Sequence, residues 1–450
     1  MEDLRITGLT LNNVGVFERL ELSFKKKPLK DKAEIHIFTG ENGTGKTTLL
    51  EALTYFDYEC NKLLKQQRKD KEDEDMLVQK VKREKRERDD EFDERDDFYR
   101  MKGHRNREEK YSIELYLNKR EMFFSVHRSP HLTNSEFIEE YYNEKYFAKY
   151  MHTYNFFAYD GHRQLRDTKV EVLKDFEYNP ITEALTFNKT DVNVNLFQWI
   201  ANNKTRAALS FQKGNKKDSD KYLASIQKIE TAISEIIGRR IEFVIEEYSL
   251  NVMVKLDDEP IFYNTLADGY KSVISWLTDL VFRLDYMPKE GQENFTLFLD
   301  EIDVHLHPAA QRRILPVIQK LFPKAQIFLT THSPFVIGSV DDAWVYKFKL
   351  NENGKSVLDG EPFLTEDAKS YRFILDEVFD IKNQFGIEVE KKLEGFYLKR
   401  DEIIKNYSSP SLRELVKISR ELASQSTELQ AIMGNELRQL SRILKKEITL

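Results

Sequence analysis

The hydrophobic and polar positions of the first 60 residues predict a hairpin, a buried strand and a helix. Apolar residues alternate with polar ones between residues 4 and 24, which is typical of two short antiparallel strands with one buried face. Residues 35–39 are mostly apolar and lead into a glycine-rich turn, and residues 46–53 then carry apolar side chains at helical spacing. Strand, glycine turn and helix therefore follow one another in the order that a phosphate-binding loop requires.

The rest of the chain alternates between the same two periodicities. Period-two or continuous apolar runs predict strands at residues 111–117, 122–126, 155–159, 241–245, 250–254, 295–299 and 326–330. Helical spacing predicts helices at residues 194–238 with a polar turn at 213–217, at 269–284, at 309–321 and over most of the chain beyond 366. The runs 295–299 and 326–330 have no polar face, as in parallel strands that are covered on both sides. We therefore predict an α/β fold built on a mixed sheet with central parallel strands.

Residues 61–110 interrupt this pattern, because apolar residues nearly vanish and basic residues alternate with acidic ones. The balanced charges favour an exposed insertion over a nucleic-acid-binding arm. The chain has no internal repeat and no long linker rich in Gly, Ser or Pro. We expect the following organisation: an N-terminal lobe at 1–60 and 111–190, the charged insertion at 61–110, a helical lid at 191–240, a C-terminal lobe at 241–365 and a C-terminal helical region at 366–450.

Composition restricts the cellular compartment and the classes of partner that we expect for the protein. A single cysteine among 450 residues, Cys60, excludes an intramolecular disulfide framework and a cysteine-only zinc site. The N-terminus lacks the basic-then-apolar pattern of an export signal, and no apolar stretch is long enough to span a membrane. We therefore expect a cytoplasmic protein with no membrane partner. The net charge of −7 argues against a protein that coats nucleic acid but permits a local basic groove.

The glycine-rich turn fits the phosphate-loop pattern G-x-x-x-x-G-K-[ST] in full. Its glycines let backbone N–H groups turn toward a phosphate chain, and the N-terminus of the following helix adds partial positive charge. Lys46 would neutralise the β- and γ-phosphates, and the Thr47 hydroxyl would bind Mg²⁺. The residues that we expect to bind the nucleotide here are Gly40, Asn42, Gly43, Thr44, Gly45, Lys46, Thr47 and Thr48.

Two further strand ends carry side chains that such a site needs. The strand 295–299 is followed by Asp300, which can hold Mg²⁺, and by Glu301, which can orient the attacking water or accept its proton. The strand 326–330 is followed closely by His332, whose imidazole could hydrogen-bond the γ-phosphate. We therefore predict Lys46, Glu301 and His332 as catalytic residues, and Thr47 and Asp300 as metal ligands.

Residues 265–272 form a small-residue turn that opens the long helix 269–284. The N-terminus of that helix is a second anion site, and one nucleotide cannot easily use both sites within one subunit. The sequence thus leaves open how the phosphate site is completed.

As a set, these motifs resemble those of ABC-class ATPases of the SMC, RecF and OLD type. Residues 11–17 with the phosphate loop look like the opening of that family, residues 266–272 like its signature motif, residues 299–308 like its acidic strand and loop, and residues 331–334 like its switch histidine. The resemblance covers residues 1–60 and 240–345. It implies an ABC-type P-loop ATPase head that uses ATP and Mg²⁺.

The resemblance also implies that two heads sandwich two ATP molecules, so that the chain forms a homodimer. We also expect a higher oligomer, whose order the sequence leaves open. The signature residues Ala267, Asp268 and Gly269 would then serve the nucleotide of the opposite subunit. Ala267 stands where the family usually has serine, which implies slow hydrolysis. The lid glutamine of the family has no clear counterpart: Gln164 is a candidate, and the nearby Arg163 could serve phosphate, a partner or the core.

Several features of related classes are missing from the sequence. It lacks the long heptad coiled coil of SMC proteins, the Toprim motifs of OLD nucleases and a histidine-based nuclease cluster. The chain therefore looks most like the PtuA family of Septu anti-phage ATPases, including retron-linked versions. This resemblance implies a regulatory ATPase whose nuclease, of the HNH type, is a separate chain. DNA or a phage component is a candidate trigger, which the sequence leaves open.

Two other functions stay open at this point. The first is a RecF-like DNA-repair clamp without a nuclease partner, and the second is a self-sufficient abortive-infection toxin. Apolar stripes in the helices after residue 366 indicate either a docking surface for a partner or the core of those helices.

Overall fold

The computed structural model describes residues 5–26, 32–54, 111–117, 122–128, 155–161, 170, 173, 196–246, 249–287, 294–367, 370–381 and 385–450. Cys60 and the charged insertion 61–110 lie outside these ranges. The chain divides into two compact units, Met1–Ile374 and Leu375–Leu450. Within the described ranges, no helix combines the length and the apolar composition that crossing a lipid bilayer requires.

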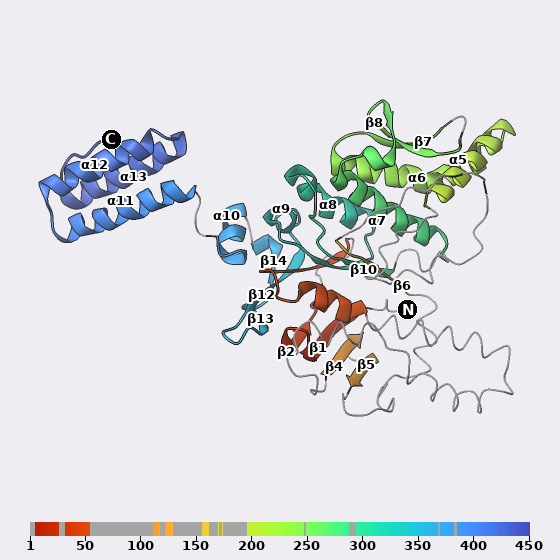
Figure 1. The fold of residues 1–450 in the computed structure, drawn as a ribbon, viewed down its shortest axis with the longest axis horizontal. Helices are drawn as coiled ribbons and strands as arrows, with labels where there is room; N and C mark the ends of the chain where they lie inside the picture. The colour runs from red at the N-terminus through yellow and green to blue at the C-terminus, as the bar shows by residue number, and fades with distance from the viewer. Residues whose placement is uncertain are drawn as a thin grey trace. The chain divides into compact units, whose positions relative to one another are not determined.

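A seven-stranded mixed sheet forms the centre of the first unit (Figure 1). Its order is β13-β12-β3-β11-β10-β6, and β14 pairs with β12. The bounds are β3 (Glu34–Gly40), β6 (Asn155–Tyr159), β10 (Phe295–Leu299), β11 (Gln326–Thr330), β12 (Ala343–Leu350), β13 (Ser356–Leu358) and β14 (Phe363–Leu364). The strands β6, β10, β11, β3 and β12 run parallel, which confirms the predicted parallel centre.

A four-stranded antiparallel sheet lies on one face of the seven-stranded sheet. Its order is β2-β1-β4-β5, with β1 (Ile6–Val14), β2 (Phe17–Ser23), β4 (Tyr111–Leu117) and β5 (Met122–Arg128). The turn between β1 and β2 uses Gly15 at φ +56°, which a glycine adopts without strain. The predicted N-terminal hairpin is therefore confirmed, and β4 extends it by pairing with β1.

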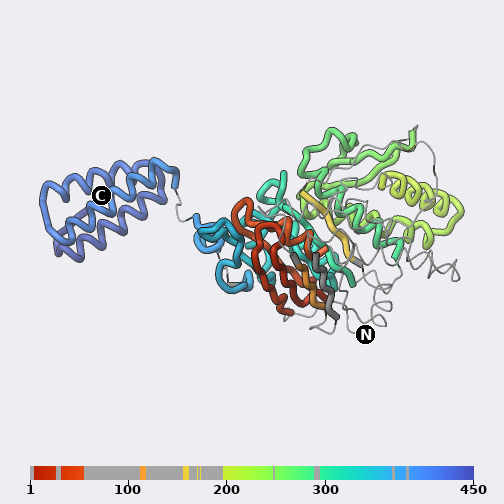
Figure 2. Tube along the Cα trace, turned by 60° about the horizontal axis from the view of Figure 1, so that its bottom comes forward, coloured from red at the N-terminus to blue at the C-terminus, as the bar shows by residue number. Residues whose placement is uncertain are grey.

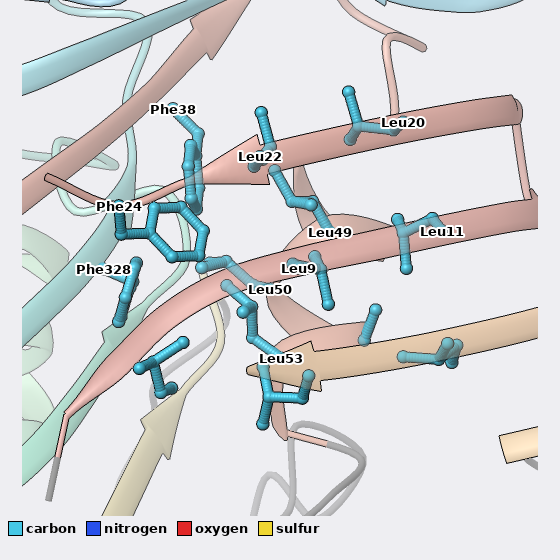
Figure 3. Close-up of a cluster of buried hydrophobic side chains, with 14 of the residues drawn as sticks. Leu9, Leu11, Leu20, Leu22, Phe24, Phe38, Leu49, Leu50, Leu53 and Phe328 are labelled. Carbon is cyan, nitrogen blue, oxygen red and sulfur yellow. The ribbon is translucent and has the colours of Figure 1, made fainter. Parts of the chain in front are cut away.

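The core of this half of the unit lies between the two sheets and the helix that begins at Lys46. Figure 3 shows that leucines of β1 and β2 point toward the leucines of this helix and toward the phenylalanines of the central sheet. The helix is described over residues 46–54, and its Leu49, Leu50 and Leu53 are fully buried. Burying leucine side chains of this kind stabilises the fold by roughly 2 kcal/mol each. The phosphate loop thus stands between two rigid elements, β3 and a helix anchored in the core.

Helices cover the opposite face of the central sheet (Figure 1). They are α5 (Leu196–Gln212), α6 (Lys216–Ile237), α7 (Asp268–Asp285), α8 (Pro308–Leu321) and the short α9 (Pro334–Ile337). Helices α5 and α6 form an antiparallel pair, and α6 also packs against α7 and α8. The side chain of Asn215 caps the start of α6, and Gly238 at φ +80° ends it. The region predicted as a lid is therefore packed along the helices of the unit.

A small antiparallel sheet lies between α6 and α7 in the sequence. It consists of β7 (Ile241–Ile245), β8 (Val252–Leu256) and β9 (Glu259–Ile261), and a short 3₁₀ turn, η4 (Tyr263–Thr265), then leads into α7. A second 3₁₀ turn, η5 (Thr365–Asp367), follows β14, and the short α10 (Tyr371–Phe373) runs into a single π-helical turn, η6 (Ile374–Val378).

A buried polar network joins the two sheets at the end of β3 that is remote from the phosphate loop. The Arg5 guanidinium donates to both carboxylate oxygens of Glu34, and His36 contacts Glu34 through Nε2 at 2.6 Å and the Tyr346 hydroxyl through Nδ1 at 3.2 Å. Gln326 donates to the same carboxylate at 3.0 Å and to the Ile6 carbonyl at 2.9 Å. The network therefore links β3, β11 and β12 with the N-terminal strand.

The second unit is a bundle of three helices, α11 (Ile387–Lys405), α12 (Ser409–Ala423) and α13 (Thr427–Leu444) (Figure 2). Leu393 and Phe396 of α11, Leu415 of α12 and Met433 of α13 belong to one buried cluster. The apolar stripe that the sequence shows around Leu415 therefore packs inside this unit. Two large side chains of α11 stay outside the cluster, because Ile387 is 76% exposed and Leu398 is 70% exposed.

Candidate functional site

The loop between β3 and the following helix has a backbone that three glycines make possible. Gly40, Gly43 and Gly45 have φ values of +146°, +84° and +82°. A Cβ on Gly40 would lie 2.2 Å from the Phe348 carbonyl oxygen, and one on Gly45 would lie 2.6 Å from a methyl carbon of Val16. A Cβ on Gly43 would have no neighbour within 4 Å. The loop is thus tightly backed at its two ends and open at its apex.

Lys46 folds back over this loop. Its Nζ donates to the carbonyl oxygens of Gly40 at 3.1 Å and Glu41 at 2.9 Å, and the side chain is almost fully buried. Burial lowers the pKa of Lys46, while the nearby carboxylates Asp300, Glu301 and Asp303 favour its charged form. Thr44 closes the loop with a 2.8 Å bond from its hydroxyl to the Glu41 carbonyl. The exposed Asn42 lies at the apex.

Thr47 and Asp300 meet directly although 253 residues separate them. The Thr47 hydroxyl donates to Asp300 Oδ2 at 2.8 Å, and the Thr330 hydroxyl donates to Asp300 Oδ1 at 2.5 Å. Both contacts arise because β3, β11 and β10 are neighbouring parallel strands, so that the segments following them meet at one sheet edge. A hydroxyl beside a carboxylate is the oxygen set that Mg²⁺ prefers.

Glu301 has a left-handed backbone, with φ +45°. Its N–H donates to the Thr330 hydroxyl at 2.7 Å, so that one threonine fixes both acidic residues. Its side chain packs on the backbone after β6, because a Cβ on Gly161 would lie 2.9 Å from Glu301 Oε2. Non-glycine residues rarely adopt this conformation, and such exceptions cluster at functional sites.

His332 follows β11 and is half-buried beside the same acids. Burial lowers its pKa, the positive charge of Lys46 lowers it further, and Asp303 and Asp300 oppose both effects. The preceding Thr331 donates from its hydroxyl to Asp303 and accepts the Ser333 N–H at 3.0 Å. The imidazole is therefore held neutral, able to donate one hydrogen bond and accept another.

The predicted signature residues lie at the start of α7. Ala267 is the N-cap and has no side-chain hydrogen bond, while Asp268 pairs with Lys271 at 3.2 Å. Position 269 requires glycine, because the backbone of His305 lies so close that a Cβ there would be 2.4 Å from its carbonyl oxygen. The first N–H groups of a helix have no acceptor within the helix, and Ala267 brings no oxygen to them.

The described residues fit a nucleoside triphosphate with Mg²⁺. The loop has an open glycine apex, a buried lysine and a helix N-terminus, and a Thr–Asp oxygen pair adjoins it. Thr47 and Asp300 would hold the ion, which supplies positive charge to the β- and γ-phosphates when bound. Thr48, beside Thr47, is buried and its side chain packs against Gly15 in the β1–β2 turn, so that it supports the loop.

The structure thus brings Lys46, Thr47, Asp300, Glu301 and His332 together at adjoining strand ends. It places Gly269 against the loop that follows β10, and within the described residues no hydrogen bond joins Ala267, Asp268 or Gly269 to the phosphate loop. Gln164 and Arg163 lie outside the residues that the structure describes.

Four residues that the sequence analysis misses support the site. Thr330 fixes Asp300 and Glu301, Gly161 receives the Glu301 side chain, Ser356 bonds the Thr44 carbonyl, and Gln311 bonds the loop after β10. The glycine and the threonine stand at strand ends, where their position was a usable signal. The serine bonds a carbonyl in a remote segment, and the glutamine bonds carbonyls five and eight residues before it. Neither contact leaves a pattern in the sequence.

Comparison with known proteins agrees with these motifs. The family described as "AAA domain, putative AbiEii toxin, Type IV TA system" matches residues 35–338, from β3 through α9. The chain belongs to this AAA domain family. The matched range of this AAA domain contains the phosphate loop, the signature turn, the acidic strand and His332.

The relatives of this AAA domain include a Septu protein and a retron-linked probable ATPase. It is 26% identical to the Septu protein PtuA of Bacillus thuringiensis over 229 residues, which is 44% of this chain and 57% of PtuA. It is 25% identical to the "Retron Ec83 probable ATPase" of Escherichia coli over 138 residues, which is 29% of this chain and 25% of that protein. These matches confirm the predicted similarity to PtuA and the retron ATPases. The chain spans a quarter to just over half of the length of these two relatives.

Solved structures with a similar chain path include an SMC head bound to the C-winged helix domain of ScpA and the SMC head domain from Thermotoga maritima. The first has a TM-score of 0.44 at 12% identity, over 81% of this chain and 98% of the SMC chain. The second has a TM-score of 0.40 at 12% identity, over 79% of this chain and 99% of the other.

Proposed function

We propose that this chain is a slowly hydrolysing ATPase head that ATP and Mg²⁺ convert into a closed homodimer within an anti-phage defence complex. The observation that carries the proposal is the 2.8 Å bond between Thr47 and Asp300, with Lys46, Glu301 and His332 around it. The names of the relatives, PtuA and retron ATPases, support the defence setting.

Each residue of the site has a role in this proposal. Lys46 and the loop N–H groups bind the β- and γ-phosphates, and Thr47 and Asp300 hold the metal ion. Glu301 orients the attacking water and accepts its proton, and the neutral His332 hydrogen-bonds the γ-phosphate. The water oxygen then bonds to the γ-phosphorus, the bond from that phosphorus to the β–γ bridging oxygen breaks, and ADP leaves with the bridging oxygen while the γ-phosphate is released as inorganic phosphate.

The second half of the site comes from another copy of the chain. The uncapped N-terminus of α7 offers N–H groups and partial positive charge to an anion, which supports a contact with the γ-phosphate of the opposite subunit. Ala267 supplies no hydroxyl to that contact, and this supports slow turnover. Higher oligomers would build on this dimer.

The effector in this proposal is a nuclease of the HNH type on a separate chain, with DNA or a phage component as trigger. The second unit supports a docking role, because it has its own buried core and keeps Ile387 and Leu398 of α11 exposed. A RecF-like DNA clamp is the competing function, and it would show DNA binding that weakens steeply with salt.

Two substitutions test the core of the proposal. Lys46→Ala should abolish ATP binding in a calorimetric titration, because the buried cation of the loop is lost. Glu301→Gln should bind ATP and accumulate as a dimer in light scattering after gel filtration, because the γ-phosphate stays uncleaved. Lys213→Ala, in the exposed turn between α5 and α6, is the matched lysine control. Wild-type turnover by the Glu301→Gln variant would disprove the assigned role of Glu301.

A further inference from the structure

Gln311, in the first turn of α8, uses both ends of its side-chain amide to join two loops of the site. Its Nε2 donates to the carbonyl oxygens of Leu306 at 2.9 Å and Asp303 at 3.2 Å, and its Oε1 accepts the Ser333 hydroxyl at 2.7 Å. Only this orientation of the amide satisfies all three partners, because carbonyl oxygens cannot donate. Gln311 therefore ties the loop after β10 to the segment that carries His332.

The loop after β10, residues 301–307, has a backbone that needs such support. Glu301 at φ +45° and His305 at φ +61° both lie in the left-handed region, which non-glycine residues seldom adopt. Side chains from outside the loop hold it: Thr330 accepts the Glu301 N–H, Thr331 donates to Asp303, and Gln311 bonds two of its carbonyls. Of these three residues, only Gln311 lies outside β11 and the segment that directly follows it.

The same loop touches the signature turn. The carbonyl oxygen of His305 lies so close to Gly269 that a Cβ there would approach it to 2.4 Å, and it would also meet Leu306 at 3.5 Å. His305 precedes Leu306, whose carbonyl Gln311 holds. A displacement of this loop toward α7 would therefore push the start of that helix, since backbone meets backbone without a flexible side chain between them.

We propose that Gln311 is a positioning residue that couples the switch segment 331–333 to the signature turn 267–269 through the loop 301–307. The inference rests on the proposed ATP-dependent dimer. Gln311 touches neither the phosphate loop nor the metal ligands, so it acts on closure and hydrolysis and leaves the binding of ATP by one subunit unchanged. The residues it joins are those that would sense the γ-phosphate on one side and present α7 to the partner on the other.

The test replaces Gln311 by methionine in the full chain, because methionine has a similar length and no amide. We expect the Kd for ATP to stay within about twofold of wild type, while kcat and the affinity of the ATP-dependent dimer each fall about tenfold, because all three hydrogen bonds of the Gln311 amide are lost. Gln311→Glu should lose as much, since its carboxylate still accepts from Ser333 but cannot donate to the two carbonyls.

Gln319 on the same helix provides the matched control. Its Nε2 donates to the Ala33 carbonyl at 3.3 Å and to Asp342 Oδ1 at 2.9 Å, away from the site. Gln319→Met should lower Tm but leave kcat and dimer affinity unchanged. Gln311→Met with normal kcat and dimerisation, or equal losses of kcat in both methionine variants, would overturn the inference. If the Glu301→Gln variant itself forms no ATP-dependent dimer, the proposed function fails first, and the two failures are thus distinguished.

Discussion

The hydroxyl of Ser356 donates a 2.7 Å hydrogen bond to the carbonyl oxygen of Thr44, across 312 residues of sequence. The backbone N–H of Ser356 donates to the Val16 carbonyl at 2.9 Å. Strand β13 therefore holds the phosphate loop and the turn between β1 and β2 in one arrangement. Both Thr44 and Ser356 are buried, so water cannot replace the hydroxyl bond without rearrangement.

Ser356→Ala should weaken ATP binding about fivefold, because the buried Thr44 carbonyl loses its partner and the loop loses about 1 kcal/mol of support. Calorimetric titration of nucleotide measures the change. Ser339→Ala is the control, since Ser339 also donates to a backbone carbonyl, that of Val336 at 2.7 Å, but away from the loop. Equal affinities in both variants would show that the Ser356 bond does not shape the nucleotide site.

Ala267→Ser should raise the rate of ATP turnover about fivefold. A serine hydroxyl at the N-cap of α7 adds a hydrogen-bonding group, worth about 1 kcal/mol, where the proposed partner nucleotide binds. Ala267→Gly is the control, because glycine is an acceptable N-cap but brings no hydroxyl, so that it reports the effect of the backbone alone. A steady-state phosphate-release assay compares the three proteins, and an unchanged rate in the serine variant would rule out Ala267 as the cause of slow hydrolysis.

The network around Glu34 and His36 predicts a loss of stability in acid. Burial alone would raise the pKa of Glu34, but the hydrogen bonds from His36 and Arg5 outweigh it and lower the pKa from 4.5 to about 2. Burial lowers the pKa of His36 below its ordinary 6.5. In the unfolded chain both groups take up protons that the folded protein excludes, so stability falls as the pH drops below 6.5 and falls further below 4.5.

Glu34→Gln should therefore reduce the dependence of the free energy of unfolding on pH below pH 4.5. The wild-type free energy of unfolding should lose up to about 3 kcal/mol through Glu34 between pH 4.5 and pH 2, and the variant should lack this component. Urea unfolding at a series of pH values measures it. Glu361→Gln, at an exposed position, should follow the wild-type curve. If the free energy of unfolding of Glu34→Gln depended on pH as that of the wild type does, Glu34 would not be the source of this acid sensitivity.

The second unit gives a sharp test of partner docking. Deleting residues 385–450 removes α11, α12 and α13 together and should leave ATP binding intact, while a co-expressed nuclease partner should no longer co-purify. Leu398→Asp changes only an exposed position of α11 and should have the same effect on co-purification. Leu393→Asp, at a buried position of the same helix, should unfold the bundle. Undiminished co-purification with Leu398→Asp would contradict docking on this face.

The sequence was sufficient to predict those elements and motifs that a local pattern of residues encodes. The phosphate-loop motif, the parallel strands β10 and β11, and the helices α7 and α8 all follow from spacing within a few residues. The meeting of Thr47 with Asp300 follows too, because parallel strands bring the segments after them to one edge.

The sequence was insufficient where contacts join remote segments or elements are very short. β9, β13 and β14 have three, three and two residues, too few to show a period. β12 is longer, and the apolar run of residues 343–348 could have predicted it. The bond of Ser356 to the Thr44 carbonyl and the bond of Gln311 to the Ser333 hydroxyl depend on tertiary placement, and serine and glutamine are common surface residues.

The strands that pack behind the phosphate loop are synthesised much later than the loop itself. The loop itself emerges early, but the strands that brace it, β12 with Phe348 and β13 with Ser356, are made some 300 residues later. A nascent chain that has not yet reached these strands has the complete nucleotide-binding motif and no rigid wall behind it. The rigid form of the loop therefore depends on residues 348–356 as much as on its own motif, and a fragment that ends before β12 should have a mobile loop.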